Sequence, residues 1–155
     1  PAGVPVAEAR ILTRAEAASA HALPPPYVVK PVDEGSSVGV LIIRPGNNEW
    51  SAAILSGGKP DDIVMIERYI AGRELTCAVI GGFVTGVIEI KPKDGLVFYD
   101  FEAKYAPGGS IHELPAKVLP DVYQLVRKYT GAAHLALGCR GVSRADFRYD
   151  DTPGG

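Results

Sequence analysis

The chain has little of what marks the more specialised classes of protein. It contains no run of basic residues, its 16 Lys and Arg are balanced by 18 Asp and Glu, and 8% of its residues are aromatic. A nucleic-acid partner therefore has little electrostatic or stacking support. No apolar run approaches the roughly 20 residues of a membrane helix, and the N-terminus lacks the layout of a secretory signal. These absences predict a cytosolic protein with neither a membrane span nor nucleic-acid binding.

Cysteine is scarce as well. Cys77 lies in an apolar run and Cys139 follows a predicted helix end, and the chain has no CxxC pair and no histidine cluster with metal-ligand spacing. We therefore expect two reduced, packed thiols and assign no role to the three histidines. What remains is a chain of 155 residues with a net charge of −2, which has room for one ordinary domain with a hydrophobic core.

Three helices are predicted from capping signals and apolar spacing. They span 14–22, 47 or 48 to 55, and 120–138. The first follows Thr13 and Glu16, which have the spacing of a capping box, and the second is expected to be capped by Asn47 or Asn48. The third begins at Pro120, because proline suits the first turn of a helix.

Six strands are predicted from runs of apolar and β-branched residues. They span 27–30, 38–43, 63–67, 73–80, 83–90 and 141–149. Gly81-Gly82 suits a two-residue turn, so antiparallel hairpins are expected. The stretch 91–119 shows no periodicity, which indicates a loop too long to be a mere connection. Because strands and helices do not alternate regularly, the fold class is α+β, an α+β sandwich rather than a doubly wound sheet.

The stretch 27–40, YVVKPVDEGSSVGV, places Lys30 at the end of an apolar strand and just before a Gly-Ser-Ser turn. A lysine there must reach outward to solvent or meet an anion, and Gly35, Ser36 and Ser37 can offer backbone N–H groups to a phosphate. The GxxxxGK[ST] order of a P-loop is absent. From these residues alone, a phosphate clamp and an ordinary hairpin turn remain equally open.

Two further pairs of charged residues leave a choice between chemistry and surface structure. Glu67 and Glu74 flank the connector RYIAG, which can receive a base and a ribose, although two solvated glutamates have the same pattern. Arg144 and Asp146 stand two apart in one strand, so they share a face. A carboxylate there can hold a divalent cation and a guanidinium can stabilise an oxyanion, but a surface ion pair on an edge strand has the same spacing.

A third candidate region is the segment 98–116, which combines aromatic residues, Lys104 and a Pro-Gly-Gly turn. This composition is typical of a loop that folds over a ligand and excludes water. The segment is therefore expected to belong to an active site.

Four long motifs together resemble one family. The segments VKPVDEGSSVG, ERYIAGRE, FYDFEAKY and GCRGVSRADF follow in this order and are similar to the corresponding segments of D-alanine–D-alanine ligases, members of the ATP-grasp superfamily. The resemblance implies an ATP-grasp fold with mixed or antiparallel sheets and flanking helices, present here incompletely. It implies a linker and short helix at 1–23, a small nucleotide-clamping lobe at 24–90, and the active-site loop with the first part of the large lobe at 91–155.

The resemblance also implies roles for individual residues. Those implied to bind ATP are Lys30, Ser36, Ser37, Glu67, Arg68, Tyr69, Ile70, Glu74, Phe98 and Lys104. Those implied to act in catalysis are Ser36, Tyr105 and Arg144, and the implied ligand of magnesium or manganese is Asp146. In this scheme Lys30 touches the α- and β-phosphates, Lys104 reaches the γ-phosphate, and Arg144 stabilises the tetrahedral intermediate.

The implied reaction is the ATP-dependent ligation of two D-alanines through an acyl phosphate, for peptidoglycan precursor synthesis, in an enzyme that is usually a homodimer. The chain starts at Pro1 without an initiator Met and stops at Gly155 after a strand-like run, so we expect it to be the middle of such an enzyme. Alone, it is expected not to ligate D-alanine. Two other hypotheses stay open: another ATP-grasp carboxylate–amine ligase, such as a D-alanine–D-lactate type, and a catalytically silent nucleotide-binding module.

Overall fold

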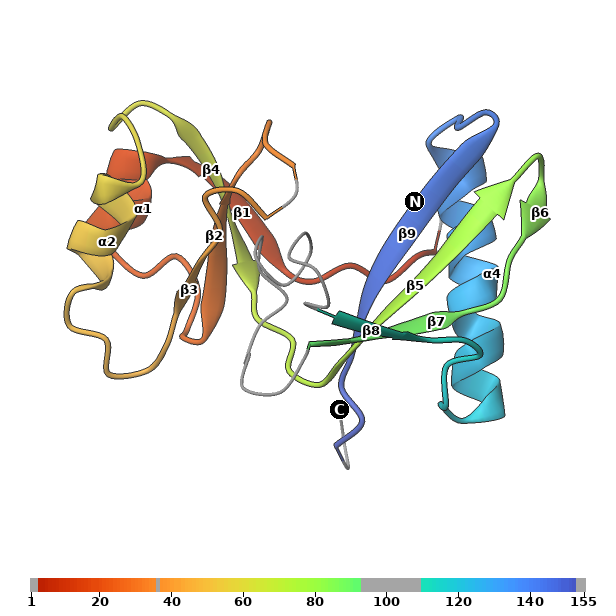
Figure 1. Ribbon diagram of the computed structural model, residues 1–155. Helices are drawn as coiled ribbons and strands as arrows, with labels where there is room; N and C mark the ends of the chain where they lie inside the picture. Colours follow the sequence, from red (N-terminus) through yellow and green to blue (C-terminus); the bar gives the residue numbers. More distant parts are fainter. Residues whose placement is uncertain (1–2, 36, 93–109, 153–155) are drawn as a thin grey trace. The chain divides into compact units, whose positions relative to one another are not determined.

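The computed structural model describes residues 3–35, 37–92 and 110–152, and the chain falls into two compact units (Figure 1). The first unit is Val6–Tyr69, and the second joins Ile70–Gly155 with Pro1–Pro5. Each unit has its own sheet and its own hydrophobic core. The division at Ile70 lies inside the segment 24–90, so these two compact units differ from the lobes that the resemblance implies, which stay a prediction.

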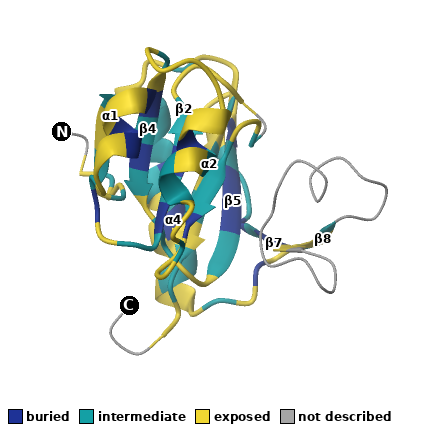
Figure 2. Ribbon diagram, turned by 90° about the vertical axis from the view of Figure 1, so that its left-hand side faces the viewer, coloured by how far each residue is buried: buried dark blue, intermediate teal, exposed yellow. Residues whose placement is uncertain are grey.

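In its described residues, the first unit is a four-stranded antiparallel sheet with two helices, in the strand order β1-β4-β2-β3. Its elements are β1 (Ala9–Thr13), α1 (Arg14–Ser19), β2 (Tyr27–Pro31), β3 (Leu41–Ile43), α2 (Trp50–Ser56) and β4 (Ile63–Arg68). Both helices cover the same face of the sheet, because residues of α1, α2 and three of the strands form one core cluster. The buried residues of this core are dark blue in Figure 2.

The helix ends of the first unit confirm one capping prediction and correct another. The capping box at α1 is present, since the N–H of Glu16 donates to Thr13 Oγ1 at 3.2 Å and the N–H of Thr13 donates to Glu16 Oε2 at 2.8 Å. The prediction that Asn47 or Asn48 caps α2 is wrong. Asn47 Oδ1 accepts from the N–H of Glu49 at 2.9 Å, which closes a turn before the helix begins.

One strand of the first unit was missed. The segment read as part of a linker contains β1, which pairs along its whole length with β4. Its sequence, ARILT, is short and has neither a clear alternation nor an uninterrupted apolar run. The predicted strand 38–43 is also shorter than expected, because 38–40 belong to the turn that precedes β3.

In its described residues, the second unit is a five-stranded antiparallel sheet packed against one long helix. Its elements are β5 (Arg73–Ile80), β6 (Phe83–Val84), β7 (Ile88–Pro92), β8 (Ser110–Glu113), α4 (Pro120–Ala136) and β9 (Val142–Tyr149). Strand β5 is central, with β9 along one edge and with β6 and β7 along the other. The fold is therefore α+β with antiparallel sheets, as predicted.

Two strand predictions in the second unit need correction. The predicted strand 83–90 is divided into β6 and β7, and the predicted loop 91–119 contains β8. The division falls near Gly86, where an added Cβ would lie 3.1 Å from Tyr123 Oη of α4. The N–H of Val87 donates to that same hydroxyl at 3.0 Å, so the helix replaces a strand partner here.

The helix α4 begins at Pro120 and is followed by Gly138 with φ +62°, as its sequence predicts. Its buried Val126 packs on Leu75 and Cys77 of the central strand β5. Both cysteines are free, and Cys77 is buried in this core. None of the helices in the described residues is long and apolar enough to cross a membrane.

Candidate functional site

The strand register places two predicted ATP-binding residues on one face of the first sheet. Lys30 stands opposite Met65, and Glu67 is two residues further along β4, whereas Val29 and Ile66 point into the core beneath the helices. Lys30 Nζ donates to Glu67 Oε2 at 2.7 Å, with side chains 34% and 29% exposed. The face of this sheet opposite α1 and α2, here called the helix-free face because no helix of the described residues in this unit packs on it, therefore holds a cation and a carboxylate side by side.

Apolar side chains share this helix-free face with the Lys30–Glu67 pair. The register adds Ile11 of β1, Val28 of β2, Ile42 of β3, and Ile63 and Met65 of β4. An apolar floor beside a few charged groups is typical of sites that bind a planar ligand with a charged tail. The arrangement suits a nucleotide base with its phosphates.

The turn after β2 is partly closed on itself. The N–H of Val38 donates to Gly35 O at 3.1 Å, and the N–H of Val40 donates to Ser37 O at 3.4 Å. Ser37 has φ +63°, which is rare for a residue other than glycine and is found mostly in turns and ligand sites. One residue of this turn thus has a left-handed backbone conformation, and two of the turn's N–H groups are already used.

The connector after β4 also uses its own backbone groups. The N–H of Arg68 donates to Glu8 O at 2.8 Å, and the N–H of Tyr69 donates to Pro26 O at 3.3 Å. In the second unit, Arg148 Nε donates to Ile70 O at 3.1 Å. The first two bonds hold residues 68–69 to the first unit, and the third holds Ile70 to the second unit.

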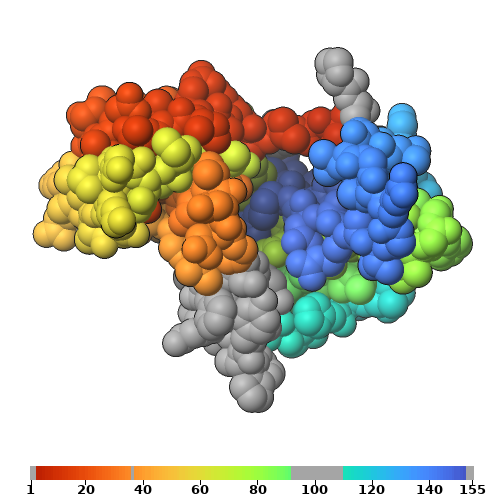
Figure 3. Space-filling model, turned by 90° about the horizontal axis from the view of Figure 1, so that it is seen from above, coloured from red at the N-terminus to blue at the C-terminus, as the bar shows by residue number. Residues whose placement is uncertain are grey.

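The remaining described candidates lie together on one face of the second sheet. In the register of β5 with β9, Glu74 stands opposite Arg148, Thr76 opposite Asp146, and Ala78 opposite Arg144. This face is opposite the one that packs on α4, and the exposure of β9 alternates as its sequence predicts. Atoms of β9 (blue) lie at the surface in the view of Figure 3. Glu74, Arg144 and Asp146 are thus brought together.

Asp146 is the centre of the contacts on this face. Arg144 Nε and Nη2 lie 2.9 Å from Asp146 Oδ1 and Oδ2, with side chains 61% and 44% exposed. The buried Thr76 donates its Oγ1 hydrogen to Asp146 Oδ1 at 2.7 Å. The surface ion pair that the spacing allowed is therefore present, and it joins the two residues that the resemblance assigns to chemistry.

Some of the oxygen atoms around Asp146 suit a hard divalent cation. Its carboxylate and the Thr76 hydroxyl supply oxygen, which magnesium and manganese prefer, and magnesium often uses one or two carboxylates with substrate phosphates and water. Within 3–35, 37–92 and 110–152, no three His, Cys, Asp or Glu side chains are grouped so that they could hold a metal ion. Asp146 therefore fits as one ligand among several.

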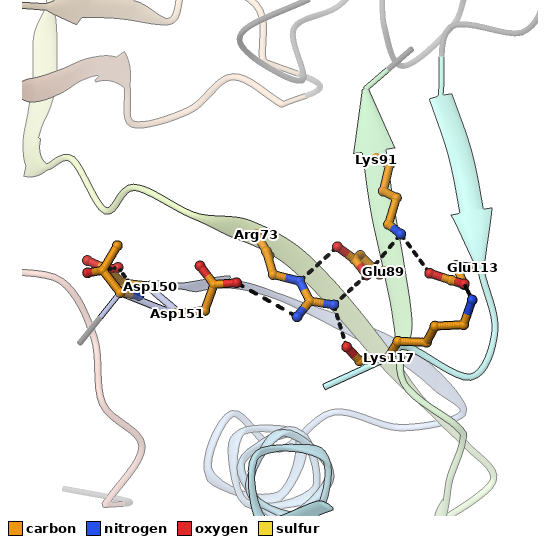
Figure 4. Close-up of polar contacts among 8 residues, drawn as sticks. Arg73, Glu89, Lys91, Glu113, Lys117, Asp150 and Asp151 are labelled. Atoms are coloured by element: carbon orange, nitrogen blue, oxygen red, sulfur yellow. Dashed lines mark hydrogen bonds and ion pairs between the residues drawn. The ribbon is translucent and has the colours of Figure 1, made fainter. Parts of the chain in front are cut away.

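One charged cluster was missed by sequence reasoning, and it lies on the face of the second sheet toward α4 (Figure 4). Arg73 Nε and Nη2 donate to Glu89 Oε1 and Oε2 at 2.8 and 2.6 Å, and Nη2 also donates to Lys117 O at 2.7 Å. Lys91 Nζ donates to Glu113 Oε2 at 2.7 Å and lies 3.6 Å from Glu89. The cluster joins β5, β7, β8 and the segment before α4.

These contacts shift the acidities of the cluster. The bidentate Arg73 lowers the pKa of Glu89, and Lys117 together with Lys91 lowers the pKa of Glu113 from 4.5 to about 2. The only sequence signal was the polar Glu89 within the run IEIKP, at a position that faces Leu75 of the core. We assign the cluster to structure, because its charges satisfy one another.

Four predicted site residues lie outside the described residues. These are Ser36, Phe98, Lys104 and Tyr105. The described candidates are Lys30, Ser37, Glu67, Arg68 and Tyr69 in the first unit, with Ile70, Glu74, Arg144 and Asp146 in the second.

Two solved ligase structures match this fold over nearly the whole chain. VanG D-Ala:D-Ser ligase from Enterococcus faecalis matches 97% of this chain at 31% identity and a TM-score of 0.77, over 46% of its own length. D-alanine–D-alanine ligase from Bacillus anthracis matches 96% of the chain at 30% identity and a TM-score of 0.71, over 49% of its length. The chain has the α+β fold of part of an ATP-grasp ligase.

Sequence comparison gives the family. The model described as "D-ala D-ala ligase C-terminus" matches residues 1–154, so the chain belongs to this family. The D-alanine–D-alanine ligase of Methylobacterium radiotolerans is 59% identical over 155 residues, which is 99% of this chain and 50% of that protein. That of Afipia carboxidovorans is 60% identical over 151 residues. The chain spans about half the length of the curated relatives it matches.

Proposed function

We propose that the polypeptide carrying this chain is an ATP-dependent ligase that joins two D-alanines into D-alanyl-D-alanine for peptidoglycan synthesis. The observation that carries the proposal is that Glu74, Arg144 and Asp146, from two motifs far apart in sequence, share the face of the second sheet opposite α4. Family membership over residues 1–154 supports it. We further propose that the complete enzyme is a cytoplasmic homodimer.

In the proposed reaction, a carboxylate oxygen of the first D-alanine attacks the γ-phosphorus of ATP and ADP leaves. The amine of the second D-alanine then attacks the carbonyl carbon of the acyl phosphate, loses a proton, and phosphate leaves. Such a transfer needs charge neutralisation and positioning rather than a covalent enzyme intermediate. Arg144, exposed on the sheet face, has the charge to stabilise the negative charge that develops on the carbonyl oxygen.

We propose that the first unit binds the nucleotide. Lys30 meets the α- and β-phosphates, the Glu67 carboxylate meets the base, and the connector 68–70 packs beside it. Lys30 can leave Glu67 without uncovering a fully buried charge, because both side chains are about one-third exposed. Ser37 of the turn after β2 is proposed to lie near the phosphates.

In the second unit, Glu74 is proposed to bind the ribose hydroxyls, and Asp146 is the proposed ligand of magnesium or manganese. A divalent cation bound there would neutralise phosphate charge. Phe98 is proposed to pack near adenine and Lys104 to reach the γ-phosphate. Ser36 and Tyr105 are proposed to orient an acid–base group. These four roles rest on the resemblance, since the residues lie outside those described.

The test compares the complete natural polypeptide with the 155-residue chain in a phosphate-release assay with ATP, magnesium and D-alanine. We expect D-alanine-dependent release from the complete polypeptide and none above background from the chain. Calorimetry with ADP and magnesium adds a binding readout. A complete polypeptide that binds ADP without releasing phosphate would favour the catalytically silent module, and one that does neither would contradict the proposal.

The identity of the second substrate is a separate question. A D-Ala:D-Ser ligase matches the chain at a TM-score of 0.77, so an acceptor other than D-alanine is the second candidate. Competition among D-alanine, D-serine and D-lactate as acceptors, read out by the mass of the product, separates the candidates. We expect D-alanyl-D-alanine as the main product.

A further inference from the structure

The carboxylate of Asp146 receives hydrogen bonds from two residues that differ in how firmly they are held. Thr76 Oγ1 donates to Oδ1 at 2.7 Å, and Arg144 contacts both oxygens at 2.9 Å. A carboxylate has about four lone-pair sites, so these contacts occupy most of them. A cation can bind this carboxylate through both oxygens only if one partner leaves.

Thr76 is the fixed partner. It lies on the central strand β5, directly opposite Asp146, and only 6% of its surface is exposed. A β-branched side chain in a strand has few rotamers available. Its hydroxyl hydrogen has a second acceptor at Ala145 O, but at 3.3 Å that contact is the weaker one.

Arg144 is the replaceable partner. It lies on β9, which pairs only with β5 among the described strands, and 61% of its side chain is exposed. An exposed ion pair contributes little free energy, because water stabilises both charges when it separates. Releasing Arg144 therefore costs little.

We propose that Thr76 is a positioning residue that holds Asp146 in place while Arg144 is exchanged for a divalent cation on the same carboxylate. The inference rests on the proposed role of Asp146 as a metal ligand. The exchange has a second consequence, since it frees the Arg144 guanidinium to meet the anion that develops on the substrate. Binding of the cation to Asp146 and release of the Arg144 guanidinium for the substrate are then one event.

The first test measures Mn2+ binding to the complete natural polypeptide in the presence of ADP, by the electron paramagnetic resonance signal of free Mn2+. The matched variants are Thr76→Ser and Thr76→Ala. Both lack the methyl group of threonine, and they differ from each other only in the hydroxyl, which serine keeps and alanine lacks. Loss of an outer-shell partner typically weakens metal binding 10- to 100-fold, so we expect roughly a 10-fold higher Kd for Thr76→Ala and a Kd within about 2-fold of the parent for Thr76→Ser.

The second test examines the exchange itself, with Arg144→Lys. Lysine keeps the charge but cannot hold both oxygens in a planar fork. If Arg144 competes with the cation, this variant should bind Mn2+ about 3-fold more tightly than the parent. An unchanged Kd would overturn the exchange.

Asp146→Asn separates a failure of this inference from a failure of the proposed function. Mn2+ binding that is lost in Asp146→Asn but equal in Thr76→Ala and Thr76→Ser overturns the positioning role alone. Binding that is the same in Asp146→Asn and in the parent overturns both. A thermal unfolding curve of each variant, with the Ser and Ala variants compared directly, excludes a loss of folding as the cause.

Discussion

The two faces of the second sheet each carry an arginine–carboxylate pair with nearly the same geometry. On the face toward α4, Arg73 contacts Glu89 at 2.8 and 2.6 Å, and the Glu89 side chain is 6% exposed. On the opposite face, Arg144 contacts Asp146 at 2.9 Å through both oxygens, with side chains 61% and 44% exposed. The geometry is shared, whereas the surroundings differ.

This difference decides what each pair can do. Breaking the first pair would leave the Glu89 carboxylate, 6% exposed, without its two short bonds and with Lys91 3.6 Å away, so Arg73 and Glu89 serve the fold. Breaking the exposed pair costs little, so Arg144 and Asp146 can separate and meet ligands. The hydrogen-bond distances alone would not show that the two pairs differ in the free energy needed to separate them.

The largest expected loss of stability comes from disturbing the pairing of β5 with β9, because these two strands carry residues of both faces of the second sheet. Gly72 has φ +91°, and an added Cβ would clash with the backbone oxygen of Tyr149 in β9, whereas Gly82 has φ +87° and open space around it. Gly72→Ala should therefore lower the free energy of unfolding by about 3 kcal/mol or more, and Gly82→Ala by about 1 kcal/mol. Urea denaturation of both variants measures the difference. Equal losses would mean that β5 and β9 can shift at no cost.

The next largest effect compares the two faces directly with one chemical change. Glu89→Gln should cost about 2–3 kcal/mol, because it removes a buried carboxylate charge that Arg73 and Lys91 both contact, and Asp146→Asn should cost less than about 1 kcal/mol. Denaturant unfolding at neutral pH gives both values. If the exposed pair proves as costly as the buried one, Arg144 and Asp146 serve the fold, and the division between the faces is wrong.

Low pH should lower the free energy of unfolding through the charged cluster on the face of the second sheet toward α4. The pKa of Glu113 is lowered from 4.5 to about 2 by Lys117 and Lys91, and the pKa of Glu89 is lowered by Arg73. A lowered carboxylate pKa adds stability that is present above about 4.5 and is lost as pH falls from there toward 2. Stability measured from pH 6 to pH 3 should fall in the parent and less steeply in Glu113→Gln. Glu113→Asp, which keeps the charge, is the control, and a parallel fall in Glu113→Gln would contradict the assignment.

Sequence reasoning succeeded where one local pattern determines the structure. The alternation of β9 put Arg144 and Asp146 on one face, the pair Thr13 and Glu16 formed the capping box, and Pro120 began α4. Each depends on residues within four positions of one another. The four family motifs suggested residue roles that no spacing could give, and these roles stay predictions.

Sequence reasoning failed where the structure of a segment depends on a partner far along the chain. Strand β1 exists because β4 lies beside it, and the paired residues are 58 positions apart at one end of the register, Ala9 with Glu67, and 50 apart at the other, Thr13 with Ile63. The bond from Thr76 to Asp146 spans 70 residues, and that from Arg73 to Glu89 depends on the register of β5 with β7. A polar residue in a strand gives no sign of which distant charge it will meet.

The smallest expected effect asks whether the rule for exposed pairs holds in the first unit. Lys30 and Glu67 are 2.7 Å apart but about one-third exposed, at 34% and 29%. A double-mutant cycle of Lys30→Gln and Glu67→Gln should give a coupling free energy of about 0.5 kcal/mol, because both charges regain water when they separate. Denaturant unfolding of the four proteins measures it. A coupling of about 2 kcal/mol would mean that nucleotide binding must break a contact that stabilises the fold. It would also mean that, in the first unit, exposure does not distinguish ion pairs that stabilise the fold from ion pairs that can separate.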